Sequence, residues 1–139
     1  YCLRYLDTPY EPVYPFGYGI SYTTFEISSP ELSSNEMTEN GEITVSVNVK
    51  NTGNTEGIET VQLYIHDVTA SVSRPVKEMK GYKKVSLAPN EETTVTFKIT
   101  LDALKFHTFS GEYKAEKGKF KVFVSNRSDV KEFAEFKLI

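Results

Sequence analysis

Strict alternation of apolar with polar residues is the feature that most constrains the fold of this chain. Within residues 43–49 every second residue is Ile or Val, and the residues between are Thr, Ser and Asn. The same pattern recurs in residues 61–65, 95–101 and 120–124. Successive side chains of a β-strand point to opposite faces, so each stretch predicts a strand with one face toward a core and one toward water. A last strand is expected within residues 133–138.

Residues with turn preferences separate these stretches. Asn51-Thr52-Gly53-Asn54, Pro89-Asn90 and Lys117-Gly118 each supply Gly, Asn or Pro, which favour turn geometry. Residues 28–41 are interpreted as a polar loop around one weak strand. A short helical turn is expected over residues 101–106, with Asp102 as its cap.

About seven strands without helical periodicity predict an all-β fold, an antiparallel two-sheet sandwich of the immunoglobulin or fibronectin type III kind. The length of 139 residues fits one such domain. A net charge of −3 excludes the strong positive field of nucleic-acid binding. No apolar run is long enough for a membrane span, so neither nucleic acid nor membrane is expected as a partner. The single Cys2 cannot form an intrachain disulfide.

The N-terminal residues differ from the rest of the chain. Six of the nine tyrosines lie within the first 22 residues, and three prolines there favour an extended backbone. We therefore predict that residues 1–23 form an extended N-terminal arm, an interdomain linker, and that residues 24–139 form the sandwich. Tyr14, Phe16 and Tyr18 are predicted to contact a neighbouring domain, and in the isolated chain the arm could mediate self-association.

A second interpretation of the arm stays open. Phe16, Tyr22 and Phe25 could instead fold back and close one end of the sandwich core. Both interpretations can hold together, with Phe25 in the core and the tyrosines facing outward.

Two basic features lie between the predicted central strands. Arg74-Pro75 favours an extended loop, from which the guanidinium could reach a carboxylate or carbonyl of a neighbouring domain, or a carboxylate nearby in the same loop. Lys77, Lys80, Lys83 and Lys84 are interpreted as solvated residues that protect an edge strand from aggregation.

Catalytic and metal sites are not predicted. Glycoside hydrolysis needs two carboxylates about 5 Å apart for retention, or about 6.5 to 9.5 Å apart for inversion, within a cleft. The chain has only four aspartates, and its glutamates fall mostly in turn or strand-edge contexts. His66 and His107 lack a spaced set of further ligands, so neither a metal nor another cofactor is expected.

Several segments resemble one family. Residues 14–25, Y-P-F-G-Y-G-I-S-Y-T-T-F, resemble the linker that leads into the C-terminal fibronectin type III-like domain of family 3 glycoside hydrolases. Residues 67–82, which include S-R-P-V-K-E-M-K-G-Y, are similar to the strand-loop-strand signature of that domain. With Arg4-Tyr5-Leu6-Asp7 and residues 103–106, the chain most resembles periplasmic β-glucosidases of Gram-negative bacteria. Asn90 and Lys117 depart from the family, which more often has Gly and Pro there.

The resemblance implies a non-catalytic accessory domain that buttresses the catalytic domains of a longer, retaining β-glucosidase. The nucleophile and the acid/base would belong to those domains, which would act on terminal β-D-glucosides in carbohydrate metabolism. A periplasmic or secreted location is expected for the parent protein.

Two other functions remain open at this stage. A carbohydrate-binding module would need exposed rings that stack on sugars, and the absence of tryptophan disfavours it. A protein-interaction module of immunoglobulin type would need only the crowded arm.

Overall fold

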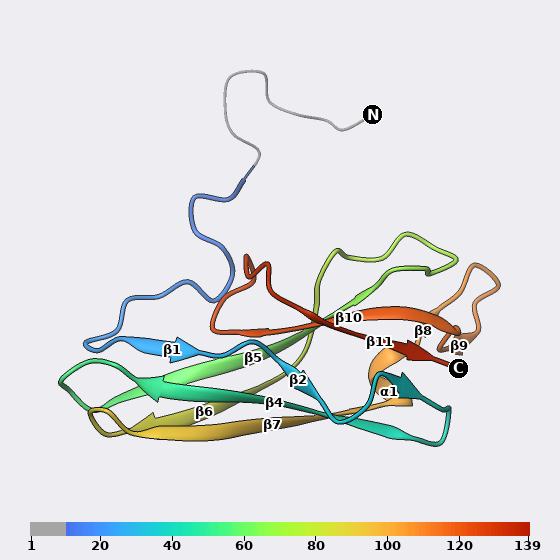
Figure 1. The fold of residues 1–139 in the computed structure, drawn as a ribbon. Coiled ribbons are helices and arrows are strands. Elements are labelled where there is room, and N and C mark those ends of the chain that lie inside the picture. The colour runs from blue at the N-terminus through green and yellow to red at the C-terminus, as the bar shows by residue number, and fades with distance from the viewer. Residues whose placement is uncertain (1–10) are drawn as a thin grey trace.

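The computed structural model describes residues 11–139, and it is a sandwich of two β-sheets (Figure 1). The first sheet contains β1 (Phe25–Ile27), β2 (Glu31–Leu32), β4 (Glu42–Asn51) and β7 (Glu92–Thr100). The second sheet has the order β3 (Glu36–Met37), β11 (Ala134–Leu138), β10 (Gly118–Ser125), β5 (Gly57–Asp67) and β6 (Glu78–Leu87). A small hairpin pairs β8 (Phe106–His107) with β9 (Tyr113–Lys114).

The predicted strand faces are confirmed. Val47 lies opposite Val95 in the β4–β7 pair, and Val122 lies opposite Ile65 in the β5–β10 pair. These side chains point inward and are buried, as are the other apolar members of the four alternating stretches within strands. Burying one such side chain stabilises the fold by roughly 1.5 to 3 kcal/mol. Two layers of β-branched and aromatic residues therefore form the core between the sheets.

The predicted all-β, antiparallel sandwich is confirmed, with three differences in detail. The 28–41 segment holds two short strands, β2 and β3, where one weak strand was expected. The β3–β11 pair is parallel, because β3 enters the sheet beside the last strand instead of forming a hairpin with it. The strand count also exceeds seven, since short strands such as β1 and β8 add pairing that alternation cannot reveal.

The helical turn is present, but the predicted cap is wrong. Helix α1 (Leu101–Leu104) begins after Thr100, which is the N-cap residue and makes no side-chain capping bond. Asp102 lies inside the first turn, where its carboxylate pairs with Lys105 at 2.6 Å. Within the described chain, no helix has the length and apolar character needed to cross a membrane.

The prediction of an edge strand is correct, but the role predicted for its lysines does not hold for all four of them. β6 forms an edge of the second sheet. Lys80 pairs with Glu78 at 2.7 Å, and the Lys83 ammonium lies 5.6 Å from the centroid of the Phe97 ring. Lys77 precedes the strand and is half-buried, so it does not protect the edge as expected.

Candidate interdomain interface

The described part of the arm carries its aromatic rings on the surface. The side chains of Tyr14, Phe16 and Tyr18 are 68%, 64% and 45% exposed. The Tyr14 and Tyr18 rings pack on each other with centroids 5.0 Å apart, across a turn in which the Tyr18 amide donates to the Pro15 carbonyl at 3.0 Å. The rings thus form a small apolar cluster that the sandwich does not cover.

The backbone of the arm, in contrast, is attached to the sandwich. The Ser128 amide donates to the Phe16 carbonyl at 2.8 Å. Gly17 has a φ of +85°, and a Cβ added there would lie 2.5 Å from the Asn126 carbonyl oxygen and 2.6 Å from Nε2 of Gln62. Only glycine fits this place, because both the conformation and the space exclude a side chain.

The attachment point belongs to a layer on the outer face of the second sheet. Tyr64 and Phe123 alternate with core residues and lie outside the core cluster, yet both are buried. The Phe133 ring, at the end of the 126–133 loop, lies with its centroid 5.6 Å from that of Phe123. The Tyr64 hydroxyl donates to Oε1 of Gln62, and Nε2 of Gln62 donates to the Asn126 carbonyl at 2.8 Å. The outer face of the second sheet, which was expected to meet water, is therefore covered. Hydrogen bonds connect this face to the arm.

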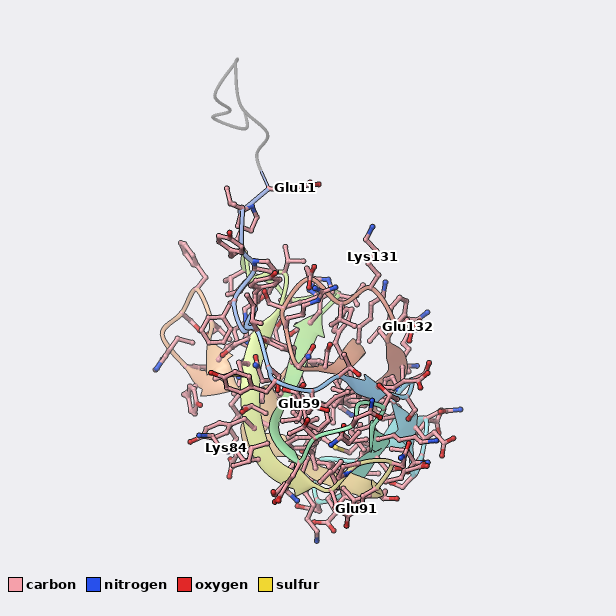
Figure 2. All side chains as sticks on the ribbon, turned by 90° about the vertical axis from the view of Figure 1, so that its left-hand side faces the viewer. Glu11, Glu59, Lys84, Glu91, Lys131 and Glu132 are labelled. Carbon is pink, nitrogen blue, oxygen red and sulfur yellow. The ribbon has the colours of Figure 1, made fainter. Side chains whose placement is uncertain are left out.

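Lys77 holds this loop in place. Its ammonium donates to the carbonyls of Ser128, at 2.8 Å, and Val130, and lies 4.5 Å from the centroid of the Phe123 ring. Burial lowers the pKa of Lys77, while Asp129 acts in the opposite direction. The same loop carries Lys131 and Glu132, which Figure 2 shows at the end of the molecule from which the arm extends to Glu11.

A buried asparagine joins the base of the arm to the core. Asn51 is fully buried, and its Nδ2 donates to the carbonyls of Thr55, at 2.8 Å, and Leu87, at 2.9 Å. Its Oδ1 accepts from the Gly53 amide at 3.0 Å and from the Thr23 hydroxyl at 2.7 Å. Phe25, two residues after Thr23, packs against the core, as predicted.

The fold-back interpretation therefore holds only for Phe25. Phe16 remains largely exposed and Tyr22 is fully exposed.

Between the arm and β5 lies an open hollow of about 450 Å³, lined by residues that include Gly17, Tyr22 and Glu59. Figure 2 shows Glu59 on the sandwich, below the point from which the arm extends.

Arg74 forms a local ion pair, the second of the two arrangements considered for it. Its guanidinium lies 2.5 Å from Oε2 of Glu78 and 4.4 Å from the centroid of the Phe106 ring, and its side chain is 12% exposed. Burial pushes the pKa of Glu78 upward, but hydrogen bonds from Lys80 and Arg74 outweigh it and hold that pKa below its usual value. An interdomain contact of Arg74, like those of Tyr14, Phe16 and Tyr18, stays a prediction.

Asp67 and Glu116 are two carboxylates whose charges influence each other. Burial raises the pKa of Asp67, and the Glu116 charge adds to that effect. Oδ1 of Asp67, however, accepts from the Thr69 amide, and both Glu116 oxygens accept from Ser71. Neither carboxylate lines the hollow beside the arm. Within residues 11–139 no His, Cys, Asp and Glu side chains gather as a metal-binding group.

The burial of Tyr64 and Phe123 could have been predicted from the sequence. Residues 63–65 and 122–124 are apolar at three successive positions, so each stretch has apolar side chains on both faces of its strand. That departure from alternation indicates a second covered face. No comparable signal identifies Lys77 or Gln62, whose side chains donate to backbone carbonyls more than 50 residues away in the sequence.

Comparison with known proteins gives the relatives of the chain. Residues 59–128 match the family model described as fibronectin type III-like domain. The chain is 52% identical over 124 residues to a periplasmic beta-glucosidase of Salmonella typhimurium and 48% identical over 139 residues to beta-glucosidase BoGH3A of Bacteroides ovatus. The alignments cover 89% and 98% of this chain, but only 16% and 19% of those relatives.

A solved structure agrees with this result. The beta-glucosidase from Listeria innocua in complex with glucose superposes with a TM-score of 0.91 at 43% identity. The superposition covers 99% of this chain and 19% of that one. The chain therefore spans less than one fifth of the proteins that it matches.

Proposed function

Because the chain belongs to the fibronectin type III-like domain family, we propose that it is the non-catalytic C-terminal accessory domain of a β-glucosidase-like family 3 glycoside hydrolase. The observation that carries this proposal is its similarity to β-glucosidases of which it spans less than one fifth. The longer protein would cleave terminal β-D-glucosides with retention, in the periplasm or outside the cell. Its catalytic residues would lie in domains before this one.

The accessory domain would buttress those catalytic domains through the arm. The backbone of the arm is attached at Phe16 and Gly17, while the rings of Tyr14, Phe16 and Tyr18 stay exposed. Covering about 100 Å² of each ring would bury about 300 Å² and contribute roughly 7 kcal/mol before the costs of association. The attachment keeps those costs low, since the backbone is already ordered.

The bonding of the carboxylates supports a non-catalytic role. Glu116 accepts hydrogen bonds from the Ser71 amide and hydroxyl, and Glu78 accepts from Arg74 and Lys80. Oδ2 of Asp67 is buried without a partner among the described residues. A glycosidase carboxylate must instead face a cleft that admits a sugar.

Hydrolysis of an aryl β-glucoside by the isolated chain and by the longer protein tests the proposal. We expect turnover by the longer protein and none by the chain. A Tyr14→Ser/Phe16→Ser variant should lower the melting temperature of the longer protein but leave that of the chain unchanged. Turnover by the rigorously purified chain, or equal melting of the variant and parental longer proteins, would contradict the proposal.

A further inference from the structure

We propose that the loop of residues 68–76 and the β8–β9 hairpin together form a second docking surface for the same neighbouring domains that receive the arm. This inference rests on the proposed function and adds a second point of attachment. Its exposed apolar side chains, Val68, Val76 and Phe109, would pack against an apolar surface of the same longer polypeptide.

The loop directs its charge inward. Between Asp67 and Lys77 the only charged residue is Arg74, and its guanidinium is occupied by Glu78 and by the Phe106 ring. Val68 and Val76 are exposed on the outside of the loop. The loop therefore exposes valine side chains while its one charged side chain is held inward, and an apolar patch of this kind is informative when it adjoins further exposed apolar residues.

The hairpin presents an aromatic ring at its tip. Phe109 is 98% exposed. The turn that carries it is well bonded, since the Thr108 amide donates to the Glu112 carbonyl at 2.9 Å and the Gly111 amide donates to the Thr108 carbonyl at 2.9 Å. Gly111 has a φ of +84°, which suits glycine. A phenylalanine exposed on an ordered turn is typical of a residue that another surface covers.

Three contacts hold the loop against the chain around the hairpin. Glu116, just after β9, accepts from the Ser71 amide at 2.9 Å and from the Ser71 hydroxyl at 2.7 Å. Thr69 packs on Gly118, where an added Cβ would lie 2.1 Å from the threonine Oγ1. Arg74 stacks on Phe106 in β8. The loop and the hairpin are therefore held next to each other.

This surface continues into the attachment site of the arm. Lys77 ends the loop and donates to the carbonyls of Ser128 and Val130, and the Ser128 amide donates to the Phe16 carbonyl of the arm. In Figure 1 the described part of the arm, the β5–β6 loop and the β8–β9 hairpin all rise on the same side of the sandwich. More than four fifths of each relative lies outside the matched region, which supplies a partner large enough to cover both places.

Hydrogen exchange on the longer protein and on the isolated chain tests the inference. We expect the amides of 68–76 and 108–111 to exchange about tenfold or more slowly in the longer protein. The turn around Glu91, which Figure 2 shows at the end opposite the arm, should exchange equally in both. If the arm alone is protected, the second surface is refuted and the proposed function stands. If neither is protected, both fail.

A matched pair of variants makes the test specific. Phe109→Ser should restore fast exchange to the 108–111 tip in the longer protein, while the exposed Thr96→Ser on β7 should not. The isolated Phe109→Ser chain should keep the melting temperature of the parental chain, which shows that the variant folds. Unchanged protection in the Phe109→Ser longer protein would overturn the inference. So would protection that the isolated chain acquires merely on concentration, since a second copy would then be the partner.

Discussion

Replacing Asn51 by leucine tests how the arm is joined to the sandwich. The asparagine side chain makes four hydrogen bonds, to Thr23, Gly53, Thr55 and Leu87, from a fully buried position. Leucine has nearly the same size but no polar atom. Asn51→Leu therefore removes all four bonds without opening a large cavity.

The expected cost follows from the groups left without partners. The Leu87 carbonyl loses its bond in the buried interior, and an unsatisfied buried group costs about 1 to 3 kcal/mol. The Thr55 carbonyl and the Gly53 amide lie in partly buried surroundings, where water replaces some of the loss, so each costs about 1 kcal/mol. With a gain of about 1 kcal/mol from the buried apolar side chain, we expect Asn51→Leu to lower the free energy of unfolding by about 2 to 4 kcal/mol.

Urea denaturation of the chain, followed by circular dichroism, measures this change. Asn48→Leu is the matched control, since Asn48 lies on the same strand, is exposed, and its side chain accepts only a surface bond from the Thr94 hydroxyl at 2.8 Å. It should change the free energy of unfolding by less than about 0.5 kcal/mol. Equal values for Asn51→Leu and Asn48→Leu would refute the assignment of Asn51 as a buried polar connection.

Three further predictions concern the core, the covering loop and the response to acid. Phe97→Ala should cost about 3 to 5 kcal/mol in urea denaturation while Thr96→Ala is nearly silent; equal costs would mean a register wrong by one residue. Lys77→Met should speed exchange of the Ser128 amide, because the loop loses its ammonium donor, and an unchanged rate would exclude that role. The pKa of Glu78 is lowered in the folded state, so its contribution is full above its unfolded pKa of about 4.3 and is lost as pH falls through the folded value. Stability measured below that pH should fall more steeply in the parental chain than in Glu78→Gln, and parallel curves would count against the ion pair.

The sequence predicted the sandwich because alternation is a local property. Val47 and Val122 reveal their buried faces through their immediate neighbours, so pairing partners are not needed to identify the core. The short strands β2 and β3 offer no such signal, because two residues cannot show a period of two. The parallel β3–β11 pair depends on segments about 100 residues apart, which turn signals do not report.

Fewer features of the candidate interdomain interface could be predicted from the sequence. Tyr14 and Phe16 are exposed. Their exposure could be predicted because aromatic residues are concentrated in a segment that lacks the alternation of a strand. Lys77, in contrast, was interpreted as one of a series of solvated lysines. Its ammonium instead donates hydrogen bonds to carbonyls 51 and 53 residues away. Asn51 appeared only as a turn residue, because its buried partners also come from other elements.

The distribution of polar groups explains how this surface could bind without large rearrangement. At each attachment, a charged side chain bonds inward to backbone or to a partner charge, as Lys77 does in the 126–133 loop and Glu116 does at Ser71. Apolar side chains of the arm and of the β8–β9 hairpin are exposed, among them Phe16 and Phe109. Ordering an interface loop usually consumes part of the binding free energy. Here the inward bonds have already ordered these loops in the isolated chain, so more of the apolar contact would remain available to hold the neighbouring domain.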